Sequence, residues 1–401
     1  MSKNLLILGA GIESADGYLE AKKLNCKIIA VDKNQKAPSL KYADKYIEAS
    51  IHNYQEILKK IKEAKYKIDG VIAFSDVSLV VAKLSHYLKT TSIPIKSAEI
   101  TSNKFLFKKK MTNYFNIPKF KKIKNLSEIK NLVNSKKTKY ILKPVDNSAA
   151  RGVILIDRYS NLDWAYRYSM KYSKKNYLIA EEYIDGPQLS TEGIVFNGKY
   201  IHLCSFDRNY EFIKKYKPFI IENGGSTPSL IAQKNYKKID EALSKVVKKL
   251  KLKNGTLKGD LIIHKKKIYL LEVATRLSGG WLSSVTIPNS TGVNLIEFAI
   301  KNSLGIKIKK NEILPKLNKN VVQRYLFPKK GLVKSIRIKD RSILKKKEIL
   351  SFKIFIKKNF IIEKIDSHVS RIGHVIVKSS SIRKGIFLAS KILKNIDIKY
   401  I

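Results

Sequence analysis

The chain has 401 residues, 44% of them hydrophobic, and its 80 Lys and Arg residues against 33 Asp and Glu give a formal net charge of +47. This length allows two or three domains with cores of their own, and the composition excludes a disordered chain. No apolar stretch nears the ~20 residues of a membrane-spanning helix, and the first residues lack the apolar region of a secretory signal, so we expect a cytoplasmic protein without a membrane partner.

The strong positive charge comes from lysine rather than arginine. Seventy of the 80 basic residues are Lys and ten are Arg, and the lysines recur along the whole chain. A nucleic-acid interface usually needs arginines for bidentate contacts, clustered on one element. We therefore expect a lysine-rich solvated surface and no nucleic-acid partner, with a basic nucleic-acid-binding protein as the rival class. The charge should still attract anionic substrates such as nucleotides.

The first 96 residues alternate short apolar runs with helical patterns. The runs cover 5–8, 27–31 and 70–74, and the helical stretches cover 14–24, 54–64 and 77–88. Buried strands separated by helices predict a parallel sheet with crossover helices. Gly9-Ala10-Gly11 follows the first strand, but a dinucleotide fingerprint would need a third glycine where Ser14 stands. The pattern therefore favours a tight turn over NAD or FAD binding.

The pattern changes after residue 96. One helix is expected over 97–115, and then hairpins and longer strands up to 315 predict an antiparallel sheet with flanking helices. From residue 316 the chain holds short strands and a final helix over 382–393. The expected class is α/β and α+β, with domains 1–96, 97–315 (lobes 115–185 and 186–315) and 316–401.

Two segments suit a nucleotide. Lys143-Pro144 leads into a turn of small residues up to Gly152, where exposed backbone N–H groups and the lysine could neutralise phosphates. A purely structural turn is equally open. Glu181-Glu182-Tyr183-Ile184 ends another strand, and its main chain could hydrogen-bond a purine base, although a solvated strand end gives the same pattern.

Asp260 and Glu272 are the strongest candidates for metal ligands. They lie on two strands of an expected hairpin, where cross-strand pairing can bring both carboxylates to one face. Hard oxygen ligands beside phosphates indicate Mg²⁺, while the alternative is that each carboxylate pairs with a lysine. Arg276, followed by Gly279-Gly280, suits an oxyanion clamp with backbone donors beside it, or a surface arginine.

In this order the motifs resemble those of the ATP-grasp superfamily, over nearly the whole chain. The resemblance implies an N-terminal Rossmann-like (pre-ATP-grasp) domain that does not bind NAD, a two-lobed nucleotide domain and a small C-terminal α+β domain. It also implies roles for individual residues: phosphate-binding lysines Lys104 and Lys143; a flexible phosphate loop from Ser148 through Arg151 to Gly152; an adenine hinge at Glu181, Glu182, Tyr183 and Ile184; Mg²⁺ (or Mn²⁺) ligands Asp260 and Glu272; and Arg276 near the transferred phosphoryl group.

Some positions depart from the family pattern. Ala274 stands where the family often has a further metal ligand, Asn, and Gln188 where several members have an acidic residue that touches the ribose. Glu192 lies where an acidic residue is common in the next strand. The substrate is left open, with Arg276, Gly279, Gly280 and Arg208 as candidate contacts; for Arg208 a solvated loop is an equal alternative.

The branch that the chain resembles comprises L-amino-acid ligases, other carboxylate-amine ligases and the purine-pathway carboxylate ligases. The resemblance implies an ADP-forming ligase that uses ATP and Mg²⁺ to join a small carboxylate to an amine through an acyl phosphate. An ATP-dependent carboxylase that activates bicarbonate is the alternative, and a fold that only binds nucleotide is a third. The family is often dimeric, so a homodimer is left open.

Overall fold

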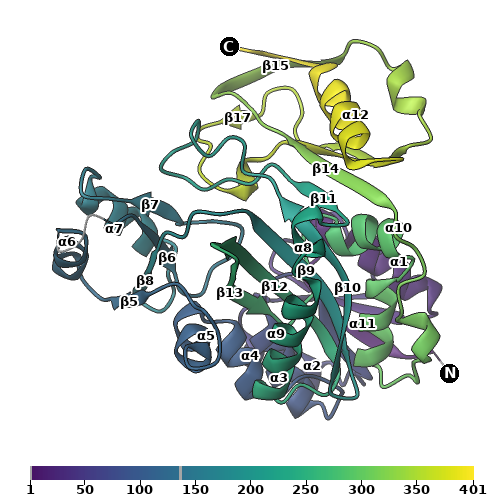
Figure 1. Cartoon of the computed structure of the whole chain (residues 1–401). Helices are drawn as coiled ribbons and strands as arrows, with labels where there is room; N and C mark the ends of the chain where they lie inside the picture. Colours follow the sequence, from purple (N-terminus) through teal and green to yellow (C-terminus); the bar gives the residue numbers. More distant parts are fainter. Residues whose placement is uncertain (1, 135–137) are drawn as a thin grey trace.

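The computed structural model describes residues 2–134 and 138–401 (Figure 1). Its first unit is a parallel sheet in the order β3-β2-β1-β4. The strands are β1 (Asn4–Leu8), β2 (Lys27–Asp32), β3 (Lys45–Glu48) and β4 (Gly70–Ala73), and the helices α1 (Ala15–Lys23), α2 (Tyr54–Glu63) and α3 (Ser78–Tyr87). The predicted parallel sheet is confirmed, with the short edge strand β3 added.

Both faces of this sheet are buried, which explains the continuous apolar runs. Alternate residues of β1 enter different cores, Leu5 and Ile7 on one face and Leu6 and Leu8 on the other. The backbone N–H of Ala10 donates to Asp32 Oδ2 at 2.8 Å. Asp32 therefore fastens the glycine turn to the neighbouring strand.

The single helix expected over 97–115 is wrong, because two helices stand there, α4 (Ile95–Thr101) and α5 (Lys104–Met111). Asn103 lies between them in an extended conformation, and its Oδ1 accepts hydrogen bonds from the N–H groups of Phe105 and Leu106. An asparagine that caps a helix in this way starts a new helix rather than continuing the old one. The break places Lys104 in the first turn of α5.

A small antiparallel sheet follows, in the order β5-β8-β6-β7, and forms a separate lobe beside the larger sheet (Figure 1). Its elements are β5 (Phe120–Ile123), α6 (Leu126–Asn134), β6 (Tyr140–Pro144), β7 (Ile154–Ile156), α7 (Leu162–Met170) and β8 (Leu178–Glu182). Lys143 at the end of β6 and Glu181 at the end of β8 thus come from neighbouring strands.

The largest sheet has eight strands in the order β13-β12-β9-β10-β11-β14-β18-β16. Its strands are β9 (Gln188–Phe196), β10 (Lys199–Arg208), β11 (Gly225–Thr227), β12 (Gly255–His264), β13 (Lys267–Ala274), β14 (Asn320–Leu326), β16 (Ile349–Ile354) and β18 (Gly373–Ser379). The C-terminal strands therefore extend the central sheet across the expected boundary at residue 316. A separate three-stranded sheet contains β15 (Gly331–Ile338), β17 (Ile361–Ile362) and β19 (Ile396–Tyr400).

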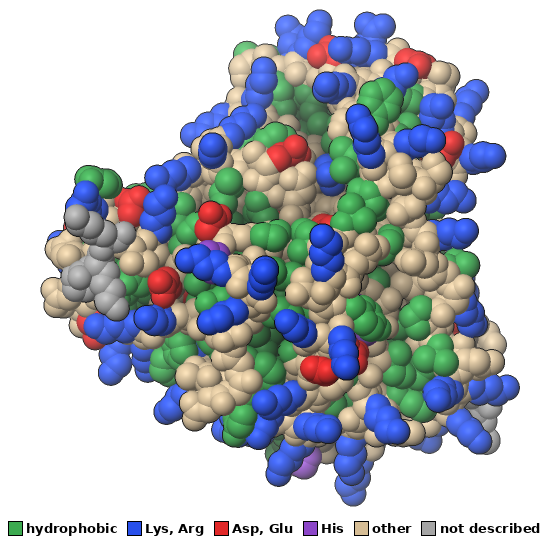
Figure 2. Space-filling view, viewed as in Figure 1, with side chains coloured by type: hydrophobic (Ala, Val, Ile, Leu, Met, Phe, Trp, Pro, Cys, Tyr) green, Lys and Arg blue, Asp and Glu red, His purple; other side chains and the backbone are tan. Residues whose placement is uncertain are grey.

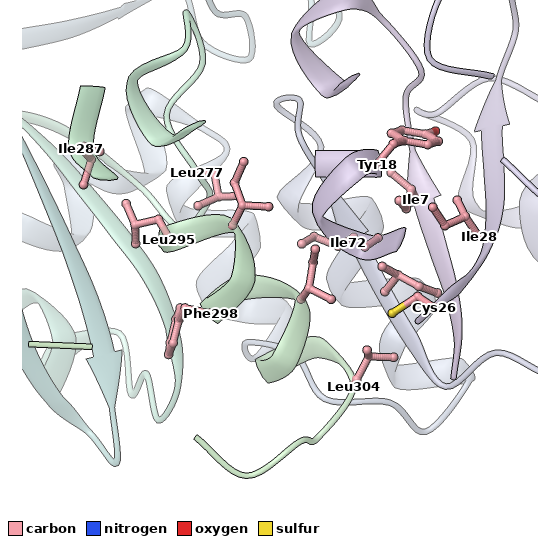
Figure 3. Close-up of a cluster of buried hydrophobic side chains, with 14 of the residues drawn as sticks. Ile7, Tyr18, Cys26, Ile28, Ile72, Leu277, Ile287, Leu295, Phe298 and Leu304 are labelled. Atoms are coloured by element: carbon pink, nitrogen blue, oxygen red, sulfur yellow. The ribbon is translucent and has the colours of Figure 1, made fainter. Parts of the chain in front are cut away.

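The remaining helices pack against this large sheet and its neighbours. They are α8 (Leu230–Gln233), α9 (Tyr236–Lys249), α10 (Ile287–Thr291), α11 (Leu295–Ser303) and α12 (Ile382–Lys394). Figure 3 shows that one hydrophobic core joins the first unit to the large lobe: Ile7, Ile28 and Ile72 lie in the same cluster as Leu295 and Phe298 of α11. This shared core fixes the N-terminal sheet against the strands that carry the site.

Lysine is widespread on the face of the molecule that Figure 2 shows. Figure 2 shows Lys and Arg side chains scattered over the whole of this face rather than gathered on one element, as a composition-driven charge predicts. Among the residues that the structure describes, no helix combines the length and apolarity needed to cross a membrane.

Candidate active site

The β12–β13 hairpin carries the two predicted carboxylates. Asp260 and Glu272 are direct partners in its register, so both side chains stand on the same face. A register irregularity follows at Asp260/Leu261, immediately beside the pair. The prediction that the hairpin brings these two acids together is confirmed.

Asp260 is 5% exposed and is held by two cations. Its Oδ2 lies 2.8 Å from Lys258 Nζ and 3.4 Å from Arg208 Nη1. Its other oxygen, Oδ1, is buried and has no hydrogen-bond partner within the described residues. A buried carboxylate oxygen without a partner is costly, which makes it a candidate ligand for a cation.

Glu272 is more accessible and faces Lys104, whose Nζ lies 3.4 Å from Glu272 Oε2. Partial burial alone would raise the pKa of Glu272. Four nearby cations instead hold this pKa well below its usual range: Lys104, Lys258, Lys143 and Arg276. The carboxylate is therefore ionised at every physiological pH. Both acids do pair with lysines, as the alternative from sequence held, and Asp260 Oδ1 is still left without a hydrogen-bond partner within the described residues.

The two predicted phosphate-binding lysines lie near Glu272 and Glu181. Lys104 Nζ also donates to the backbone carbonyl of Asn147 at 2.7 Å, which ties it to the start of the small-residue loop. Lys143 Nζ lies 2.8 Å from Glu181 Oε2. The buried side chain of Glu181 thus points at a lysine, so any contact of Glu181 with a base would have to come from its main chain.

The loop from Ser148 to Gly152 is a tight, strained turn. Ala149 and Ala150 both have φ of 56° and Gly152 has φ of 72°, a left-handed conformation that is unusual for alanine. Arg151 folds back so that its Nε donates to the carbonyl of Ser148. The N–H of His368, from the C-terminal region, donates to the carbonyl of Ala149 at 3.0 Å.

The expected adenine hinge offers fewer main-chain donors than predicted. The N–H of Glu182 donates to the carbonyl of Lys119, and the N–H of Tyr183 donates to that of Lys139. Those two N–H groups are therefore already hydrogen-bonded within the small lobe. A main-chain contact with a purine base would have to come from Ile184 or from main-chain carbonyls. Gln188 begins β9 opposite Ile262 in the register.

Arg276 lies at the junction with the N-terminal unit. Its Nε donates to Asp76 Oδ1 at 3.0 Å and its Nη1 to the carbonyl of Leu277 at 3.0 Å. Asp76 follows β4, so the arginine is anchored by a carboxylate from the first sheet. Burial alone would raise the pKa of Asp76, but Arg276 keeps it below the usual range. Arg276 is not a free surface arginine.

The Gly279-Gly280 turn differs from the expected oxyanion hole. The N–H of Gly280 donates to Glu13 Oε2 at 2.8 Å, and the carbonyl of Gly280 accepts from Gln323 and Tyr325. That backbone donor is therefore already used within the protein. Glu192 is buried beside this turn and accepts a hydrogen bond from Ser278, and burial raises its pKa to about 7.

Arg208 does not lie in a solvated loop, and its contact with a substrate stays a prediction. It ends β10, pairs with Glu222 at 2.5 Å and reaches Asp260. Sequence reasoning missed Lys258, although strand alternation could have found it, because residues two apart share a face. It also missed Asp76 and Lys108, whose partners are distant in sequence.

The residues present fit a divalent cation of the magnesium type. Within the described chain no group of three or more His, Cys, Asp or Glu side chains forms a cage for a metal. Mg²⁺ does not need one, since it commonly takes one or two carboxylates, substrate phosphates and waters. Asp260, with its unpartnered Oδ1, and Glu272 supply such a pair.

Comparison with known proteins identifies the fold. A family model described as "ATP-grasp domain" matches residues 101–280, and one described as "PylC-like, N-terminal domain" matches residues 5–95. The chain therefore contains an ATP-grasp domain, with a PylC-like unit in front of it.

Individual relatives are more distant. Formate-dependent phosphoribosylglycinamide formyltransferase from Prochlorococcus marinus (strain NATL2A) is 28% identical over 190 residues, 46% of this chain and 48% of the relative. The chain thus spans about half the length of this curated relative. Among solved structures, L-amino acid ligase from Bacillus licheniformis has a TM-score of 0.85 at 18% identity, covering 100% of this chain and 99% of that one. Phosphoribosylglycinamide synthetase from Anaerococcus prevotii has a TM-score of 0.77 at 22% identity, with 100% of both chains covered. These likenesses confirm the ATP-grasp fold.

Proposed function

We propose that the chain is an ATP-dependent carboxylate-amine ligase that works through an acyl phosphate and releases ADP and phosphate. The observation that carries this proposal is the in-register pair of Asp260 and Glu272. One buried oxygen of Asp260 has no hydrogen-bond partner among the described residues, and Glu272 lies 3.4 Å from Lys104 Nζ of α5. The names of the relatives support the reaction class, since they are synthetases, ligases and a formyltransferase.

In this proposal the small lobe and the large sheet hold ATP between them. The hinge at Ile184 contacts the base, and Gln188 lies towards the ribose. Lys104, Lys143 and the Ser148–Gly152 loop contact the phosphates, and Lys104 already donates to the carbonyl of Asn147, the residue before that loop. Asp260 and Glu272 would hold Mg²⁺, which when bound neutralises charge on the β- and γ-phosphates.

The proposed reaction has two steps, phosphoryl transfer to the carboxylate and amide formation. A carboxylate oxygen of the substrate attacks the γ-phosphorus, the bond to the β-phosphate oxygen breaks, and ADP leaves with that electron pair. The amine nitrogen next attacks the acyl carbon, and the bond from that carbon to the phosphate oxygen breaks. Phosphate leaves with that electron pair and takes up the proton that the nitrogen loses as the amide forms. Arg276 orients the carboxylate, because its guanidinium is fixed by Asp76 and Leu277 and cannot swing away. The phosphate loop excludes water from the acyl phosphate.

The test is a screen for ADP release across pairs of small carboxylates and amines, with product masses recorded. Formate, amino acids and bicarbonate belong in the panel. Release that requires both a carboxylate and an amine, and that disappears in Glu272→Gln and Arg276→Ala, is the expected result. Normal turnover in both variants would refute the assignment. ADP release with bicarbonate and no organic acid would instead favour the carboxylase.

A further inference from the structure

Two lysines stand one turn apart on α5 and point to the same side of the helix. Lys104 reaches the site directly, through Glu272 and the carbonyl of Asn147. Lys108, at i+4, lies behind it and is fully buried. Lysine is almost never fully buried unless it is paired, so the partners of Lys108 indicate its role.

Lys108 has two partners, from two different sheets. Its Nζ donates to the carbonyl of Leu271 at 2.9 Å, one residue before Glu272, and lies 3.3 Å from Glu181 Oε2. It therefore links α5 to β13 of the large sheet and to β8 of the small lobe. Burial lowers the pKa of Lys108 to about 8, with Glu181 opposing the fall and Lys143 adding to it.

A single oxygen of Glu181 serves two ammonium groups. Glu181 Oε2 lies 2.8 Å from Lys143 Nζ and 3.3 Å from Lys108 Nζ, and Oε1 is buried with no hydrogen-bond partner in the described part of the chain. Lys143 retains some exposure while Lys108 has none. The order from the site inwards is Lys143, then Glu181, then Lys108.

This arrangement matters when a phosphate competes for Lys143. If Glu181 had Lys143 as its sole partner, moving the ammonium to a phosphate would leave a bare buried carboxylate, which is strongly destabilising. Lys108 stays behind and keeps Glu181 paired. Lys143, Glu181 and Lys108 together also carry a net charge of +1. The single negative charge of Glu181 is therefore shared between two lysines and does not cancel the charge of Lys143.

We propose that Lys108 is a positioning residue for nucleotide phosphates, which neutralises Glu181 from behind so that Lys143 can turn to the phosphate chain. This inference rests on the proposed function, because it assumes that ATP binds at this site. It assigns Lys108 no contact with the nucleotide.

The experiment compares binding of three probes by isothermal titration: adenosine, Mg²⁺-ADP and the Mg²⁺ complex of an ATP analogue with a non-hydrolysable β–γ bridge. In Lys108→Met the analogue and ADP should bind at least about tenfold more weakly, a loss on the scale of a charge-assisted hydrogen bond. Adenosine, which has no phosphate, should bind within about twofold of wild type. Lys109→Met is the matched control, since Lys109 is exposed on the same helix.

A double variant separates positioning from plain support of the fold. Lys108→Met with Glu181→Gln leaves no bare carboxylate, so affinity for the analogue should return to near the wild-type value; this variant also serves if the single one does not fold. Equal loss of adenosine and of the analogue in Lys108→Met, wild-type affinity in that variant, or no recovery in the double variant would overturn the inference. If wild type itself fails to bind the analogue, the proposed function fails with it; otherwise only the role of Lys108 does.

Discussion

Asp260 stands directly opposite Glu272 in the β12–β13 ladder, and its Oδ1 is buried without a hydrogen-bond partner within the described residues. Lys258 and Arg208 both approach the other oxygen. The cations thus hold the carboxylate in place while one oxygen remains available. If Asp260 binds Mg²⁺ as proposed, this geometry would fix the ligand before the metal arrives.

The first prediction concerns this oxygen. Asp260→Asn keeps the shape but removes the charge, and it should lower Mg²⁺-dependent ADP release by about 100-fold or more, because the metal loses several kcal/mol of stabilisation. The check is a Mg²⁺ titration of ADP release in the two proteins. Glu241→Gln, on the exposed side of α9, is the control. A variant with unchanged Mg²⁺ dependence would exclude Asp260 as a ligand.

The second prediction concerns the anchor of Arg276. Asp76→Asn breaks a partly exposed ion pair, so the free energy of unfolding should fall by no more than about 1 kcal/mol. ADP release should fall about tenfold, because the guanidinium that we propose to orient the substrate carboxylate is no longer fixed. Thermal melts and steady-state kinetics together test this. Loss of stability without loss of turnover would show that the pair only joins the two units.

Much of this site was predictable because its central residues are close in sequence. A hairpin fixes its own register, and Lys265 and Lys266 form its turn with positive φ. Once two strands and a short connection are recognised, the pairing of Asp260 with Glu272 follows. The parallel N-terminal sheet was predictable for a similar reason, since its apolar runs are continuous and regularly spaced.

The rest depended on contacts between distant segments. Nothing local distinguishes Lys108 from Lys109 and Lys110, yet tertiary packing buries only the first. Asp76 meets Arg276 because the shared core docks the first sheet on the large lobe. The division of the 97–115 helix had a local signal in Asn103, but an asparagine caps a helix only when the chain geometry allows it.

The third prediction concerns the contact between the small lobe and the C-terminal region. Tyr168 of α7 donates to Asp366 Oδ2 at 2.8 Å. Asp366 lies two residues before His368, whose N–H donates to the carbonyl of Ala149 in the Ser148–Gly152 loop. Tyr168→Phe removes one hydrogen bond of about 1 kcal/mol, so amides of residues 148–153 should exchange hydrogen about fivefold faster. Hydrogen–deuterium exchange measures this. Tyr159→Phe, at an 80% exposed position, is the control, and equal exchange in both variants would contradict a fastening role.

The last prediction is a pH dependence that arises at His202, within the large sheet. Its Nε2 lies 3.1 Å from Ser205 Oγ, its Nδ1 is buried without a partner among the described residues, and burial lowers its pKa to about 4. The native state therefore binds fewer protons than the unfolded chain between pH 6.5 and 4, so stability falls as the pH drops through that window. By pH 5 the loss from this group should be about 2 kcal/mol.

His202→Gln removes the titrating group, so its melting temperature should fall less than that of wild type between pH 7.5 and pH 5. Both proteins contain the same carboxylates, so the difference between their changes of melting temperature with pH reports the contribution of His202. His86→Gln, at an exposed position of α3, should keep the wild-type slope. If all three proteins lose the same number of degrees, His202 is protonated in the native state at pH 5. Its edge-to-face contact with the ring of Tyr236, at 5.0 Å between centroids, would then have to tolerate an imidazolium.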